Sequence, residues 1–161
     1  MLGLKSLFTR FAKKIPTDLE APITSESWAY RRSARFGLQF NRKTKKVNMG
    51  FRRALSNDLI DQQVCPVLKT SLEKLIEPLK LLLNSLQSKA DLGHIELIES
   101  DQGPVVLLRH LSVLPKSDLQ LIKVFCEQYQ VNFLANLPKR VYLFKWSTKA
   151  FLSVTRVAMH A

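Results

Sequence analysis

The chain has 161 residues, 46% of them hydrophobic, and a formal net charge of +12. This length can bury one sizeable core, so we expect one domain with irregular ends, and a two-domain enzyme is hard to fit. Two cysteines are too few for a disulfide framework, and no apolar run approaches the roughly 18 residues that a membrane-spanning helix needs. We therefore expect a cytoplasmic protein without a membrane partner, and a monomer.

The positive charge is concentrated in the first third of the chain. Residues 1–57 carry 13 basic and 3 acidic side chains, a net of +10, whereas residues 58–161 carry 12 and 10, a net of +2. Nine of the 25 Lys and Arg lie between Arg31 and Arg53, and no acidic residue occurs from Ser27 to Asn57. Such a local cluster predicts a surface that binds a polyanion, either nucleic acid or an anionic membrane.

The first 14 residues are basic and have apolar side chains at helical spacing, at Leu4, Leu7, Phe8 and Phe11. We interpret them as an ordinary packed helix, although a transit peptide or a helix on a membrane surface has the same pattern. Residues 15–27 contain two prolines and predict an irregular connection.

Two alternating segments, residues 30–40 and 46–53, predict a hairpin with one face on the core and a cationic turn in solvent. Its cations are the candidate RNA-binding residues: Arg31, Arg32, Arg35, Lys43, Lys45, Lys46, Arg52 and Arg53. A basic face that is merely solvated is the alternative. The alternation places Phe36, Phe40 and Phe51 on the core face, which leaves Trp28 and Tyr30 as the candidates for stacking on bases.

The remaining elements follow in chain order. Leucines from 68 to 86 track one helical stripe, within which Pro78 predicts a kink or break. Residues 94–99 and 105–111 predict a second hairpin. Ser117 and Gln120 form a capping box that opens a second helix, whose buried stripe includes Cys126. Residues 131–135 predict a short strand. The order of these strands and helices along the chain predicts an α+β fold. We expect a mostly antiparallel sheet with two helices packed on it, plus an N-terminal helix and an irregular C-terminal tail.

Groups that could catalyse a reaction or hold a cofactor are few. The sequence has no glycine-rich phosphate loop and no paired-cysteine motif. His94 and His110 lie on the second predicted hairpin and could hold a metal, but surface or packing roles are the preferred interpretation. From composition, Cys65 is interpreted as a buried thiol, with a metal ligand or a nucleophile as alternatives, and Cys126 as a core residue.

Five blocks resemble, in order and spacing, the central domain of the bacterial iron–sulfur-containing 23S rRNA uracil-C5 methyltransferases. They are WAYRRSAR at 28–35, MGFR at 49–52, SNDLID to CPVL at 56–68, LGHIELI at 92–98 and GPVVLLRHL at 103–111. The intact enzymes of that family transfer a methyl group from S-adenosylmethionine to C5 of a uridine in 23S rRNA, and they carry a 4Fe–4S cluster. The resemblance implies 23S rRNA as partner and Cys65 as the fourth cluster ligand, in place of the buried thiol.

The resemblance divides the chain into residues 1–27, an N-terminal helix and connection, residues 28–135, a central RNA-binding-type domain, and residues 136–161, a tail outside the resemblance. The other three cluster ligands and the methyl-donor domain are expected outside this chain. We therefore expect no catalytic residue here and no binding of S-adenosylmethionine or a 4Fe–4S cluster by this chain alone. Residues 137–161 have five basic and no acidic side chains. We interpret this tail as an out-of-frame product, with a genuine strand and helix as the alternative.

Three hypotheses about function follow. The favoured one is a fragment of the S-adenosylmethionine-dependent 23S rRNA methyltransferase that is inactive by itself. The alternatives are a stand-alone RNA-binding module without chemistry and a remnant without function.

Overall fold

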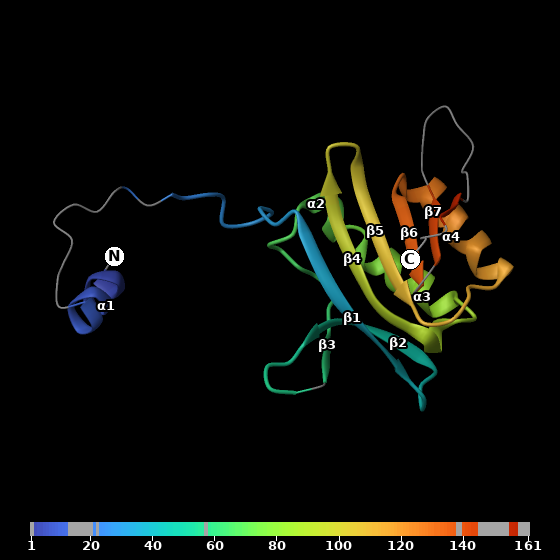
Figure 1. Ribbon diagram of the computed structural model, residues 1–161, viewed down its shortest axis with the longest axis horizontal. Coiled ribbons are helices and arrows are strands. Elements are labelled where there is room, and N and C mark those ends of the chain that lie inside the picture. The colour runs from blue at the N-terminus through green and yellow to red at the C-terminus, as the bar shows by residue number, and fades with distance from the viewer. Residues whose placement is uncertain are drawn as a thin grey trace.

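The computed structural model describes residues 2–12, 21, 23–56, 58–137, 140–144 and 155–157. Its strands form one sheet in the order β3-β2-β1-β4-β5-β6-β7-β8 (Figure 1). The strands are β1 (Ser33–Asn41), β2 (Lys46–Arg52), β3 (Leu59–Asp61), β4 (Leu92–Ser100), β5 (Gly103–His110), β6 (Asn132–Leu137), β7 (Arg140–Phe144) and β8 (Thr155–Val157). Only β5 and β6 pair in parallel, and the other neighbours are antiparallel. The predicted α+β fold with a mostly antiparallel sheet is confirmed.

Three helices cover one face of this sheet: α2 (Thr70–Glu73), α3 (Ile76–Ser85) and α4 (Lys116–Tyr129) (Figure 1). A short 3-10 turn, η1 (Lys89–Asp91), precedes β4. Helix α4 connects β5 to β6, and a helical crossover is what a parallel strand pair requires. The opposite face of the central strands carries no described helix, so it is the open face of the sheet.

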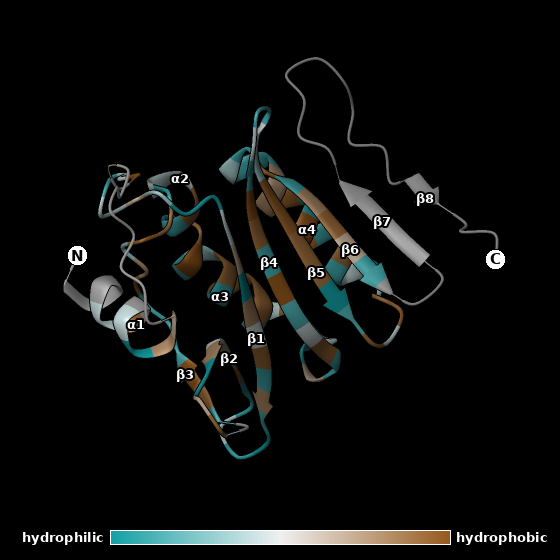
Figure 2. Cartoon of the chain, turned by 60° about the vertical axis from the view of Figure 1, so that its left-hand side comes forward, coloured by the Kyte–Doolittle hydropathy of each residue, from teal (hydrophilic) through white to brown (hydrophobic). Residues whose placement is uncertain are grey.

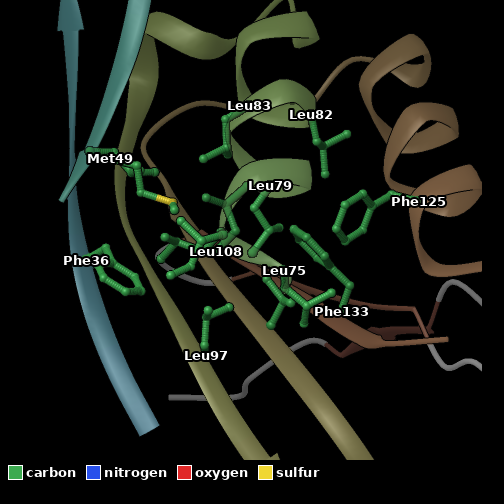
Figure 3. Close-up of a cluster of buried hydrophobic side chains, with 14 of the residues drawn as sticks. Phe36, Met49, Leu75, Leu79, Leu82, Leu83, Leu97, Leu108, Phe125 and Phe133 are labelled. Atoms are coloured by element: carbon green, nitrogen blue, oxygen red, sulfur yellow. The ribbon is translucent and has the colours of Figure 1, made fainter. Parts of the chain in front are cut away.

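The core lies between the sheet and these helices (Figure 3). Phe36, Met49, Leu97, Leu108 and Phe133 project from the strands, and all are fully buried. They meet the apolar stripes of the helices, formed by Leu75, Leu79, Leu82, Leu83 and Phe125. Burial of a side chain of this size contributes about 1.5–3 kcal/mol. The predicted stripes of both helices are therefore what holds the layers together.

The long leucine-rich segment is broken, as Pro78 predicted, but the break lies before the proline. Helix α2 ends at Glu73 and α3 begins at Ile76, which places Pro78 in the first turn of the new helix. A proline is tolerated there because the first N–H groups of a helix have no partner within the helix. The break thus costs no hydrogen bond at Pro78 itself.

The start of α4 differs from the predicted capping box. The N-cap residue is Pro115, and it makes no side-chain capping hydrogen bond, so the prediction for Ser117 is wrong. The neighbouring Asp118 is fully buried and accepts hydrogen bonds from the backbone N–H groups of Gln87 and Ser88, both at 2.9 Å. The Ser88 hydroxyl donates a third at 2.6 Å. The polar side chain of this turn ties α4 to the end of α3 instead of capping its own helix.

Both ends of the described chain depart from expectation. Helix α1 (Leu2–Ala12) lies apart from the sheet, and Leu7 and Phe11 are exposed, so the packed-helix interpretation is wrong for these side chains (Figure 1). The expected irregular tail contains β7 and β8, whose backbones pair with the sheet. Residues 140–144 therefore form a strand where an irregular tail was predicted. Among the described helices, none is long and apolar enough to cross a membrane.

Candidate nucleic-acid interface

The β1–β2 hairpin carries the basic segment of the chain. Its turn is closed by Asn41, whose carbonyl oxygen accepts the Lys45 N–H at 2.8 Å and whose Oδ1 accepts the Lys43 N–H at 2.9 Å. Asparagine is favoured at such turns because its side chain can accept from the next backbone N–H groups. Four exposed cations stand at this end of the hairpin, and we call them the tip cluster: Arg42, Lys43, Lys45 and Lys46.

The other predicted cations lie at the opposite end of the hairpin. Because the strands are antiparallel, the start of β1 and the end of β2 are neighbours. This base cluster consists of Arg31, Arg32, Arg35, Arg52 and Arg53, all exposed. Arg42 lies seven positions after Arg35, which is about 23 Å along a strand. The structure thus divides the eight predicted residues into two groups and adds Arg42, which the candidate set lacked although it lies in the same basic run.

Two cations of the base cluster are paired with acids. Arg32 Nη2 lies 3.3 Å from Asp101 Oδ1, and Arg35 Nη2 lies 2.7 Å from Glu96 Oε1. The carboxylates belong to β4 and to the turn after it, so these pairs could not be predicted from the sequence of the hairpin. Exposed pairs of this kind contribute little to stability, but they reduce the charge that a polyanion meets.

The open face of the sheet continues the base cluster with polar side chains. The strand register places Gly37 opposite His94, and His94 opposite Arg109. In the register of β5 and β6, Arg109 lies opposite Asn136. Figure 2 shows the mixture of polar and apolar residues along these strands. Alternation alone predicts which residues share a face of one strand, but it does not predict which residues of different strands become neighbours.

A hollow of about 260 Å³ opens on this face. It is lined by Arg35, Gly37, Gly50, Phe51, Arg52, Gly93 and His94. Three of these residues are glycines, so backbone forms much of the lining, and the charged groups come from two arginines. Two guanidinium groups beside backbone without side chains suit a phosphate, because glycine allows a ligand to approach the sheet closely.

Strand β3 passes close to this hollow. A Cβ atom on Gly50 would lie 1.8 Å from the carbonyl oxygen of Ile60, so only glycine allows β3 to approach at this position. A Cβ atom on Gly37 would lie 3.0 Å from a methyl carbon of Leu59. Asp61, at the end of β3, accepts a hydrogen bond from Lys80 of α3 at 2.6 Å, which ties β3 to the helix layer.

His94 is the titratable group of the hollow. Burial lowers the pKa of its imidazole, and the positive charge of Arg35 lowers it further, whereas Glu96 raises it. His94 Nε2 lies 3.4 Å from Glu96 Oε1. The lowered pKa favours a neutral imidazole at pH 7, which can both donate and accept a hydrogen bond.

A second hollow, of about 240 Å³, lies on the helix side between α3 and α4. Its lining is mainly apolar and contains no charged side chain: Pro78, Leu81, Leu82, Ser85, Leu121, Val124, Phe125, Gln128 and Tyr129. Of these two hollows, only the one on the open face has the chemistry to bind an anion.

The metal-ligand hypotheses concern Cys65 and the two histidines. His94 lies on the open face, whereas His110 is fully buried on the helix side, so the two cannot share one ion. In the described part of the chain, no three His, Cys, Asp or Glu side chains are grouped to hold a metal. Cys65 is buried, and Cys126 is buried in α4 with the pKa of its thiol raised to about 12 by burial. One thiolate at Cys65 does not fit a 4Fe–4S cluster by itself, since such clusters take four ligands.

The chain is similar in sequence to curated proteins and in fold to a solved structure. No protein-family model matches it. A protein of Psychromonas ingrahamii named 23S rRNA (uracil(1939)-C(5))-methyltransferase RlmD is 63% identical over 131 residues, which are 81% of this chain and 30% of that protein. Proteins of the same name from Shewanella frigidimarina and Edwardsiella ictaluri are 45% identical over 124 residues and 49% identical over 106 residues. The chain thus spans about a quarter to a third of the length of the curated relatives that it matches.

A solved structure shares the fold. It is the Pyrococcus abyssi tRNA (uracil-54, C5)-methyltransferase in complex with S-adenosyl-L-homocysteine, with a TM-score of 0.54 and 14% identity. The similarity covers 93% of this chain and 35% of that protein.

Proposed function

We propose, on the premise that this chain is homologous to a segment of the bacterial 23S rRNA (uracil-C5)-methyltransferases, that it is an RNA-binding part of such an enzyme. The open face of the sheet and the tip cluster are its proposed contact surface. The observation that supports this best is the hollow lined by Arg35, Arg52 and His94 beside the base cluster. Released counterions favour every phosphate that such cations neutralise.

The proposed substrate is 23S rRNA, and S-adenosylmethionine is the proposed methyl donor of the intact enzyme. The proposal assigns RNA binding to this chain and leaves methyl transfer to the whole enzyme. We also propose that residues 28–135 form the RNA-binding unit, because they contain both cation clusters and the hollow. A role of Cys65 as a cluster ligand remains a proposal that requires thiolates from outside this chain.

Phosphate contacts, rather than base contacts, are expected to dominate the affinity. Each phosphate contact changes the slope of log Kobs against log salt by about 0.7 for a single strand. Substituting Arg42→Gln and Lys43→Gln together should therefore flatten this slope by about 1.4, without changing sequence preference. The measurement is a salt titration of fluorescence anisotropy with a labelled single-stranded rRNA fragment.

A matched control removes the same charge from the helix side. Lys74 follows α2 and Lys116 begins α4, and both side chains are exposed. The pair Lys74→Gln and Lys116→Gln should leave the slope unchanged. If the control flattened the slope as much as the tip variant, the effect would be one of net charge and the tip cluster would not be a contact site.

A further inference from the structure

Two exposed aromatic side chains stand just before β1. Trp28 is 65% exposed and Tyr30 is 53% exposed, whereas Phe36 and Phe133 in the sheet are fully buried. Trp28 lies two residues before the predicted hairpin segment 30–40, and Tyr30 is its first residue. Large aromatic groups in solvent are unfavourable unless something contacts them, so two within three residues indicate a binding surface.

The backbone that carries them is held in place. The Ala29 N–H donates to the carbonyl oxygen of Pro66 at 2.9 Å, and the Arg31 N–H donates to that of Val67 at 2.8 Å. In addition, the Lys69 N–H donates to the Arg31 carbonyl oxygen at 3.0 Å. These bonds anchor the segment beside the start of α2. Side chains on a fixed backbone lose less conformational entropy when a ligand binds.

Cationic side chains follow the two aromatic rings. Arg31 and Arg32 come directly after Tyr30, and both are exposed. Arg31 Nε donates to the Ser33 carbonyl oxygen at 3.0 Å, which keeps its side chain along the segment. Aromatic rings beside arginines occur in protein interfaces and in single-stranded RNA sites. The basic segment that follows them, with no acidic residue from Ser27 to Asn57, favours RNA as the partner.

The position of the segment links it to the hollow on the open face. Five residues of extended chain lead from Tyr30 to Arg35, which is about 17 Å. One strand of RNA can therefore contact the aromatic rings and the base cluster together.

We propose that Trp28 and Tyr30 form a stacking site for unpaired bases of single-stranded RNA, an inference that rests on the proposed RNA-binding function. The bases stack on the rings while Arg31 and the base cluster neutralise the adjoining phosphates. Every base has a flat face, so this site selects for unpaired nucleotides rather than for a particular sequence.

The test uses the full chain and an oligouridylate of about 12 nucleotides. The second tryptophan, Trp146, is changed to Phe so that Trp28 is the sole indole reporter. Binding should quench the Trp28 emission. Trp28→Ala should weaken binding by about 5- to 150-fold with an unchanged salt slope, because stacking neutralises no phosphate. Trp28→Tyr, which keeps an aromatic face, should retain most of the affinity.

An abasic ribose-phosphate strand of the same length completes the test. Trp28→Ala should weaken its binding little, since it has no base to stack. Unchanged oligouridylate affinity in Trp28→Ala and Tyr30→Ala overturns the stacking site while RNA binding stands. An equal loss with the abasic strand also overturns it. Failure of the unsubstituted chain to bind either strand overturns the proposed function and the stacking site together, and self-association that Trp28→Ala abolishes assigns the rings to a protein contact instead.

Discussion

Arg35 on β1 and Glu96 on β4 form an ion pair across two neighbouring strands, with Arg35 Nη2 2.7 Å from Glu96 Oε1. The side chain of Arg35 is 66% exposed, whereas that of Glu96 is 23% exposed. A pair with this much solvent contact contributes little stability. Its main effect is to place a carboxylate beside the hollow where an RNA phosphate is proposed to bind.

Removing this carboxylate should strengthen RNA binding. In Glu96→Gln, Arg35 is free to meet a phosphate, and the salt slope should become steeper by about 0.7. Salt titration of RNA affinity measures both effects. The control Glu77→Gln removes an exposed carboxylate from α3 on the helix side and should change RNA affinity much less. Weaker binding in Glu96→Gln would argue that the ion pair orients Arg35 for the RNA.

Gly50 should be intolerant of a side chain, and Gly93 tolerant. A Cβ atom at position 50 would lie 1.8 Å from the Ile60 carbonyl oxygen, so β3 must move, whereas at position 93 the nearest atom is 3.5 Å away. Gly50→Ala should lower the free energy of unfolding by about 1–3 kcal/mol. Hydrogen exchange at the Gln62 amide, which donates to Met49, should become faster. Equal stability of the two alanine variants in urea would contradict this account.

His110 should make the protein less stable in mild acid. Burial lowers the pKa of His110 below its ordinary 6.5, whereas the hydrogen bonds of its imidazole to the backbone of Ser112 and Ala135 raise it. Between 6.5 and the lowered pKa, the unfolded chain binds more protons than the folded one. The free energy of unfolding therefore falls as the pH drops below 6.5, by up to about 1.4 kcal/mol per pH unit for this group.

Urea unfolding at about pH 7.5 and about pH 5.5 measures this contribution. His110→Gln removes the titrating group, so the variant should lose less stability between the two values than the unsubstituted chain. Equal losses would show that other groups cause the acid sensitivity.

Two leucines of α3 should differ sharply in their importance for stability. Leu79 is fully buried against the sheet, and Leu81 is 63% exposed. Leu79→Ala should lower the free energy of unfolding by about 2–5 kcal/mol because it leaves a cavity. Leu81→Ala should change it by less than about 0.5 kcal/mol, since it lies on the surface. A large loss for Leu81→Ala would mean that its face of α3 is covered in solution.

Much of the fold was predictable because it depends on local periodicity. The alternation at Ala34, Phe36 and Leu38 marked the buried face of β1, and the leucine stripe marked α3. The start of α4 was not predictable, since Asp118 satisfies backbone groups that lie 30 residues earlier in the chain. The strands β7 and β8 were missed because pairing with a sheet edge needs no strong pattern of its own.

The basic segment, the fold class and the family resemblance were all predictable before folding is considered, because composition, periodicity and motif order are properties of one chain. The grouping of the cations, in contrast, depends on how the strands pair. Antiparallel pairing separates Lys43 from Arg35 along the hairpin, and the register of β1 and β4 brings Glu96 and His94 beside Arg35. Which residues of different strands become neighbours depends on the register of the strands. Register depends on the packing of the whole core, so it cannot be predicted from any single residue.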